Sequence, residues 1–355
     1  MPPTSNRLIG IDFTYMMALV GCVIYIYVFT MGDMLQNALT HSSFNAILDI
    51  FPALFFFLNG FTVTLTMRDR RISNRKLLAY LGKRGSVLFL VGLACCAWWP
   101  MNIFIASGLM YVLAPFVAQW NTVLLRVITL LTLLVGMVML YIDVPSYTVY
   151  HLPTLEGGEI YNILGFVLFN GYFSVLPWFA FFFAGLLYGR TEIKPRGIFP
   201  PSSMLGLAFI VASYVVNVYA KGIDNDVGSV ERSDIFILNM RLLFPSFIFY
   251  GIGICIIVAN AFIFLFRQIP NGRLLKTVQA ISAMKYSVLF IHLVIGSITL
   301  SSANLPFFSK RIILFIYVVI ASFMTFYLTL LWRRRVNEQG PMEWLIKRIS
   351  GSAKK

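Results

Sequence analysis

The stretch Asn45–Thr66, NAILDIFPALFFFLNGFTVTLT, decides the fold of this chain. It is apolar over the length of about 20 residues that a helix needs to cross the hydrocarbon core of a bilayer. Its single ionisable residue is Asp49, and His41 lies just before the stretch. An ionisable side chain within hydrocarbon costs several kcal/mol unless it is paired or faces a polar cavity. The stretch therefore predicts a membrane helix whose polar groups serve a chemical purpose.

The rest of the chain has the same apolar character. Of its 355 residues 59% are hydrophobic and 12% charged, 33 are Phe, and the mean hydropathy is +0.81. Candidate membrane spans lie at about 8–31, 45–66, 85–101, 103–119, 122–142, 163–189, 203–220, 242–266, 286–302 and 312–332. The long segment 163–189 has room for an additional interfacial or re-entrant piece. We therefore expect an all-α polytopic membrane bundle of about ten, or eleven, transmembrane helices.

The basic residues segregate when the predicted spans are taken in turn. The face that holds both chain termini receives 23 of the 28 Lys and Arg residues, whereas the opposite face collects most of the Asp and Glu. Lys and Arg are retained on the cytoplasmic side of a membrane. Both termini are thus expected in the cytoplasm. The N-terminal residues lack the basic region and cleavage site of a signal peptide, so the first span is expected to remain as a helix.

Several functional classes are disfavoured by composition. The net charge of +14 is explained by the positive-inside distribution on short loops, so nucleic acid is not an expected partner. All four cysteines fall within predicted spans, and the three histidines are too dispersed to predict a metal site. No linker or repeat divides the chain. It is expected to form one domain, 1–355, with a cytoplasmic basic amphipathic tail at 333–355.

The densest positive cluster is Arg68–Lys76, with Lys83 and Arg84 behind it. Such a cluster anchors a protein to anionic lipid headgroups, or it holds the phosphates of an anionic cytosolic cosubstrate. On the other face, the acidic loops 151–159 and 221–234 either roof a site or serve as simple connections. The sequence leaves both pairs of alternatives open.

Separate stretches resemble known membrane enzymes. Arg7–Asp12 resembles the start of the transmembrane acyltransferases, although that superfamily usually continues with Arg-Gly where this chain has Tyr15-Met16. Leu39–Gly60 resembles the heparan-alpha-glucosaminide N-acetyltransferase family, in which a histidine, an aromatic-Asn pair, an aspartate and Phe-Pro precede a Phe-rich helix. Leu176–Arg190 is similar to a later helix of the same family.

Two C-terminal stretches extend the resemblance. Met284–His292 is similar to the Tyr/Ser-to-His helix of the acyltransferase superfamily, and Trp332–Arg348 resembles the C-terminal signature of bacterial YeiB-type membrane proteins. The latter also predicts, on physical grounds, a basic amphipathic interfacial helix after the Gly-Pro break. In the same physical terms, Gly185 and Gly189 predict a small-residue packing face.

The resemblance implies transfer of an acyl group, usually acetyl, from cytosolic acyl-CoA to a sugar on the opposite face. CoA is a polyanion, and guanidinium and ammonium groups bind phosphates. The residues expected to bind CoA are Arg70, Arg71, Lys83, Arg84, Arg267 and Lys285. No metal is expected. The acceptor is expected to be an extracytoplasmic glycan or lipid-linked sugar.

The expected catalytic residues are His41, Asn45 and Asp49. A His has an unperturbed pKa of about 6.5 and can take a proton from a sugar hydroxyl or ammonium; a covalent acetyl-imidazole relay is the alternative. Asn45 is a candidate donor to a developing oxyanion. Eight helical residues rise about 12 Å, so Asp49 reaches His41 only through an irregular turn, and a structural or polar-cavity role is preferred for it.

The residues expected at the acceptor site are Asp12, Asn59, Trp178 and His292. Two other functional classes stay open. A secondary transporter or flippase would use the same buried polar groups to bind substrate or protons, and a noncatalytic scaffold would explain the missing Arg-Gly. Membrane lipids are expected partners, and a homodimer is left open. The short chain favours a bacterial or archaeal cell membrane.

Overall fold

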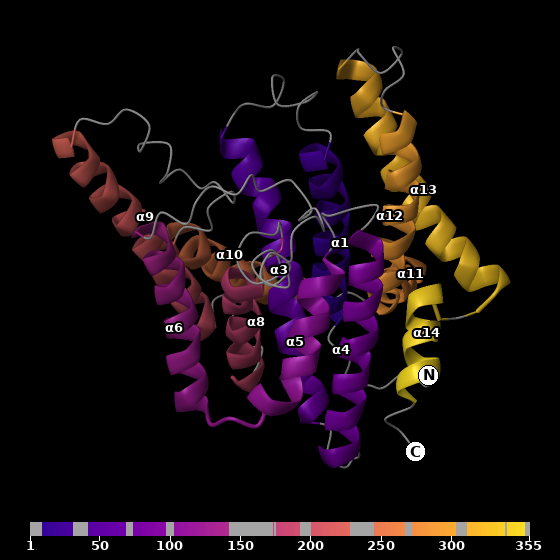
Figure 1. Ribbon diagram of the computed structural model, residues 1–355, viewed down its shortest axis with the longest axis horizontal. Coiled ribbons are helices and arrows are strands. Elements are labelled where there is room, and N and C mark those ends of the chain that lie inside the picture. The colour runs from indigo at the N-terminus through magenta and orange to yellow at the C-terminus, as the bar shows by residue number, and fades with distance from the viewer. Residues whose placement is uncertain are drawn as a thin grey trace, which may run out of the picture. The chain divides into compact units, whose positions relative to one another are not determined.

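The computed structural model describes residues 9–30, 42–68, 74–96, 103–141, 173, 175–191, 200–227, 245–266, 272–302, 311–337 and 339–351. Helices make up nearly all of these residues, and no strand occurs among them. The helices are α1 (Ile9–Thr30), α3 (Ser42–Met67), α4 (Asn74–Cys96), α5 (Phe104–Val117), α6 (Thr122–Tyr141), α8 (Val175–Arg190), α9 (Pro201–Val227), α10 (Pro245–Leu265), α11 (Arg273–Ala283), α12 (Lys285–Ser302), α13 (Arg311–Arg335) and α14 (Pro341–Ser350), labelled in Figure 1. The expected all-α fold class is confirmed.

Four of the described helices are long and apolar enough to cross a membrane. The qualifying segments are Ile9–Ile26, Ile47–Met67, Arg75–Cys96 and Ser246–Leu265. Helices α11 and α12 qualify together as a fifth, bent by 74° at their junction. An integral membrane protein is consistent with these helices, while the expectation of about ten spans stays a prediction.

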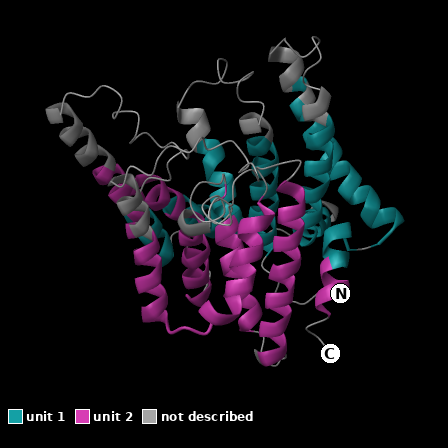
Figure 2. Cartoon of the chain, in the orientation of Figure 1, with its two compact units in different colours: residues 1–55, 193–208, 253–345 teal, residues 56–192, 209–252, 346–355 magenta. Residues whose placement is uncertain are grey.

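The chain divides into two compact units, coloured separately in Figure 2. Unit 1 comprises residues 1–55, 193–208 and 253–345, and unit 2 comprises residues 56–192, 209–252 and 346–355. Each unit collects segments that lie far apart in the sequence.

In unit 1, α1 packs against α11, α12 and α13, and α12 packs against α13. Gly10 allows α1 to approach α10 closely, since a Cβ at this position would lie 2.6 Å from the Ile263 Cα. The Phe13 ring stacks beside this contact, with its centroid 4.8 Å from Phe262 and 4.5 Å from Phe266. An apolar helix with a small residue at its crossing point can bring two backbones together in this way.

In unit 2, α4 packs against α5, while α5 and α6 pack against α8. The second half of α3 contacts α8 through glycines: a Cβ at Gly60 would overlap the Phe182 carbonyl oxygen, and one at Gly185 would overlap that of Phe57. Gly189 lies over Thr64, whose Cβ would be 2.7 Å from an added methyl group. The predicted small-residue face of Gly185 and Gly189 is therefore a packing face against α3.

The course of α4 and α11 differs from the sequence-based expectation. Residues 75–84, which the charges placed ahead of a span at 85–101, belong to α4. Leu81 and Leu77 continue its buried stripe one and two turns before Gly85. Helix α11 was not predicted. It is short and amphipathic, with Leu275, Val278 and Ile281 buried, so it lacks the continuous apolar run that reveals a span.

Candidate functional site

Two polar pairs join the start of α1 to the break between α11 and α12 in unit 1. Ser282 Oγ donates a hydrogen bond to Asp12 Oδ1 at 2.8 Å, and Lys285 Nζ donates to Tyr15 Oη at 2.9 Å. All four side chains are buried. Asp12 and Tyr15 lie three residues apart on one face of α1. Ser282 and Lys285 are also three residues apart, on either side of the break between α11 and α12. We call these four residues the Lys285 cluster.

Aromatic rings surround the Lys285 ammonium. Nζ lies 4.1 Å from the Tyr15 ring centroid, 5.4 Å from that of Tyr286 and 5.8 Å from that of Phe55. Lys285 is only 7% exposed. Removing this charge from water costs free energy. Part of that cost is offset by the hydrogen bond to Tyr15 and by cation–π attraction, which contributes about 2 kcal/mol in a desolvated setting. The rings also hold the ammonium in one position.

The helix break explains how a lysine reaches this position. Helix α11 ends at Ala283, and the N–H of Met284 still donates to the carbonyls of Ala280 and Ile281, at 3.2 and 3.0 Å. Met284 then leaves helical geometry, with φ −106° and ψ 31°, and α12 begins at Lys285. Lys285 therefore lies at the corner of the 74° bend. A corner residue can turn its side chain back toward α1.

The first turn of α12 is capped by Glu343 of α14. Glu343 Oε1 accepts hydrogen bonds from the backbone N–H of Tyr286 at 2.8 Å and of Ser287 at 3.3 Å, and Ser287 Oγ donates to Oε2. The N–H of Met342 in turn donates to Ser287 Oγ at 3.0 Å. A carboxylate is stabilised at a helix N-terminus by the free N–H groups and the helix dipole. The predicted C-terminal helix is thus present and bonded to α12.

A second polar cluster lies in unit 2 around Tyr111 of α5. Tyr111 Oη donates to Asn59 Oδ1 at 3.4 Å, and the Arg84 guanidinium lies 4.9 Å from the Tyr111 ring centroid. Asn59 and Tyr111 are buried, whereas Arg84 is half-buried. Tyr111 therefore brings together one residue predicted to bind the acceptor and one predicted to bind CoA.

The other predicted residues have varied surroundings. Trp178 is fully buried among rings, with centroids 5.2 Å from Phe56, 5.5 Å from Phe173 and 5.6 Å from Phe181. Asp49 on α3 and His292 on α12 are also fully buried. Lys83 is exposed on α4.

The side chains of the remaining predicted residues are not described. His41, Arg70, Arg71 and Arg267 are in undescribed segments, and Asn45 is described in its helical backbone only. The roles assigned to them stay predictions. Within the described residues, no group of three or more His, Cys, Asp or Glu side chains is placed to hold a metal ion.

Sequence reasoning missed five residues of these contacts, which are Tyr15, Tyr111, Ser282, Ser287 and Glu343. Two of the five lie in stretches whose sequence pattern was noted above: Ser287 within Met284–His292 and Glu343 within Trp332–Arg348. Tyr15 lies three residues after Asp12 in the same expected span. Ser282 and Tyr111 carry no signal of their own, because a Ser or Tyr in an apolar helix is common.

No protein family, curated protein or solved structure matches this chain.

Proposed function

We propose that this chain is a membrane acyltransferase that moves an acyl group, most simply acetyl, from cytosolic acyl-CoA to a sugar or glycan acceptor on the extracytoplasmic face. The observation that supports it most is the buried Lys285 cluster. An ionisable group buried in an apolar helical protein marks a functional site by default. Two of its residues, Asp12 and Lys285, lie in Arg7–Asp12 and Met284–His292, which each resemble the acyltransferase superfamily.

The proposed reaction uses His41 as general base. His41 removes the proton from the acceptor hydroxyl or ammonium, the acceptor oxygen or nitrogen attacks the thioester carbonyl, and the C–S bond breaks. The imidazolium then returns the proton to the departing CoA thiolate. In the covalent alternative, the acyl group passes first to the imidazole and then to the acceptor.

Lys285 and the arginines supply positive charge for the anionic cosubstrate in this proposal. A charge held in a low-dielectric surrounding acts more strongly on a phosphate than one in water. The aromatic rings fix the Lys285 ammonium, so little reorganisation is needed when an anion arrives. Arg84, held on the Tyr111 ring, has the same kind of support in unit 2.

Binding of acetyl-CoA to the purified full-length protein, measured by calorimetry, tests the proposal. We expect His41→Ala to bind but not to transfer, and Arg70→Ala/Arg71→Ala to bind about tenfold more weakly or worse, since a charged hydrogen bond contributes about 1.5–3 kcal/mol. Lys285→Met tests the cluster. Arg126→Ala, which removes an exposed cation from α6, is the matched control and should bind as wild type does. A folded wild-type protein that binds none of several acyl-CoAs at millimolar concentration would exclude the acyltransferase.

The α11–α12 break favours one other candidate, a secondary transporter or flippase. Transporters use discontinuous helices whose half-helix N-termini point at anionic substrates. Here the N–H groups of Tyr286 and Ser287 are bonded to Glu343, so the protein's own carboxylate occupies that end of α12. The second candidate would be favoured if the protein, reconstituted in liposomes, moves a labelled substrate across the membrane and binds no acyl-CoA.

A further inference from the structure

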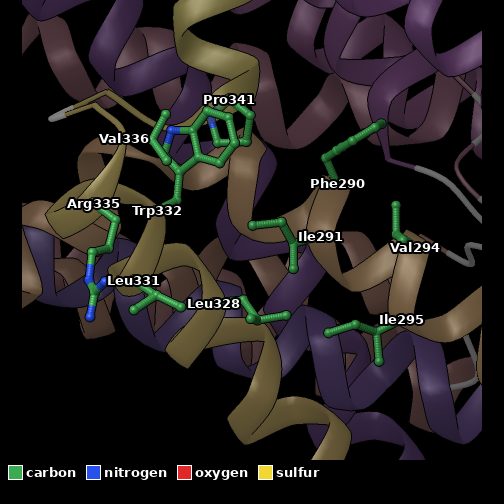
Figure 3. A pocket seen from close by; sticks show the side chains of 10 residues that line it. All are labelled: Phe290, Ile291, Val294, Ile295, Leu328, Leu331, Trp332, Arg335, Val336 and Pro341. Carbon is green, nitrogen blue, oxygen red and sulfur yellow. The ribbon is translucent and has the colours of Figure 1, made fainter.

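A groove of about 470 Å³ lies between α12 and α13 in unit 1. Its volume is within the range of about 300–1,000 Å³ that is typical of ligand sites. Figure 3 shows its walls, with side chains of α12 on one side and of α13 on the other. The residues that matter for the argument are Phe290, Ile291, Val294, Leu328, Trp332 and Arg335.

The groove is apolar along its length, and one charged residue lies at its edge. Val294 and Ile295 of α12 lie on one side, and Arg335 of α13 lies at the opposite edge (Figure 3). Leu328 and Arg335 are separated by seven helical residues, or about 10 Å of rise. Arg335 is the only charged residue among those that line the described groove. The groove therefore fits a long apolar chain, and the cation at its edge suits a ligand that carries an anionic group next to that chain.

The charged end is well supported. Arg335 is exposed in the last turn of α13 beside Arg333 and Arg334, which are exposed too. Trp332 Nε1 donates to the Gln339 carbonyl at 3.0 Å, which ties the wall of the groove to the segment that leads into α14. Trp and Arg at a helix end are typical of the level of lipid headgroups.

The surroundings favour a lipid over a protein segment as the occupant. The outward side chains of α13 before the groove are large and apolar, with Val319, Ile320 and Phe323 all more than half exposed. A bilayer covers such a surface without any protein partner. A lipid from the bilayer is therefore available to a groove formed by the same helix.

We propose that the α12–α13 groove binds one anionic phospholipid, whose acyl chain lies along Ile291, Val294 and Leu328 and whose phosphate pairs with Arg335. The proposal rests on the groove and its charge, and it is independent of the acyltransferase proposal. A zwitterionic lipid such as phosphatidylcholine would fill the apolar part and also carries a phosphate, but its choline cation is repelled by Arg335 and its neighbouring arginines, so a lipid of net negative charge is preferred.

The test uses the full-length protein in nanodiscs made from equal parts of phosphatidylcholine and phosphatidylglycerol, followed by extraction into detergent and native mass spectrometry. We expect one phosphatidylglycerol per chain to be retained in preference to phosphatidylcholine. Arg335→Ala should lower this retention roughly fivefold, the effect of about one lost cation–lipid interaction. Arg334→Ala removes the same charge from the same turn outside the groove and should leave retention unchanged.

A second pair of variants tests the apolar part. Val294→Trp fills the groove and should abolish retention, whereas Ile298→Trp, one turn further along α12 and more exposed, should not. All four positions are exposed, so the variants are expected to fold; size-exclusion chromatography checks this. Equal losses in Arg334→Ala and Arg335→Ala, equal retention of the two lipids by wild type, or full retention in folded Val294→Trp would each overturn the proposal.

Discussion

Glu343 connects the first turns of two helices through a single carboxylate. It lies in the first turn of α14, where an acidic residue is favoured, and it accepts the N–H groups that begin α12. Gly340 makes the approach possible, since a Cβ there would overlap Ser287 Oγ and lie 2.8 Å from Glu343 Oε2. The Gly-Pro-Met-Glu sequence is thus explained by contacts with α12.

Replacing Glu343 should loosen this connection. In Glu343→Ala, the N–H groups of Tyr286 and Ser287 lose a charged acceptor, which costs about 1–3 kcal/mol of stability. We expect the apparent melting temperature in detergent to fall by a few degrees. Lys347→Ala, an exposed change on the same helix, should leave it unchanged. Equal melting of Glu343→Ala and wild type would show that the carboxylate contributes nothing to the packing of α14.

At the scale of helices, the contact between α3 and α8 depends on the absence of side chains. Gly60 and Gly185 each face a backbone carbonyl of the other helix, and Thr64 Oγ1 donates across the contact to the Leu186 carbonyl at 3.0 Å. Backbone atoms cannot rotate away from an added methyl group as a flexible side chain can. The two helices must separate if either glycine is replaced.

Gly185→Ala should therefore destabilise the protein by about 1–3 kcal/mol, the usual cost of overpacking. Gly82→Ala on α4 is the matched control, because its Cβ would meet only Pro115 Cγ, at 3.9 Å. There the gain in helix propensity, up to about 1 kcal/mol, should be retained. Thermal unfolding of the two variants in the same detergent decides the matter, and a Gly185→Ala protein as stable as Gly82→Ala would contradict the close contact.

For the whole molecule, composition predicts where most helices lie in the sequence, but it predicts little about which helices pack against each other. The apolar runs place α1, α3, α10, α12 and α13 almost at their observed bounds, because a membrane helix is encoded by consecutive residues. Helix α11 is not predicted in this way, because a short amphipathic helix has the mean hydropathy of a polar loop. The start of α4 is missed for the same reason, because the charged residues Arg75 and Lys76 lower the mean hydropathy beside the buried Leu77.

The candidate site was predictable only in part. Asp12 and Lys285 could be selected from the sequence as ionisable residues near predicted spans. Their partners could not, because Tyr15 and Lys285 are 270 positions apart and nothing in a single sequence links such distant residues. Likewise, the hydrogen bonds between Glu343 and the start of α12 require a bend at Met284, and no Pro or Gly at that position predicts the bend.

The segregation of charge leads to a prediction about the whole chain, that both termini and α11 face the cytoplasm. The four native cysteines are buried, so they can be replaced by Ala to give a background for labelling. Single cysteines then go into the predicted outer loops, at Glu156 and Glu231, and onto exposed positions of the predicted inner face, at Lys276 and Lys347. An impermeant thiol reagent should label the first pair in intact cells and the second pair only after permeabilisation, because Lys and Arg hold their segments inside. Labelling of Lys276→Cys from outside would reverse the assigned face of the Lys285 cluster. A cytosolic acyl-CoA could then no longer approach Lys285 from the side that the proposed reaction requires.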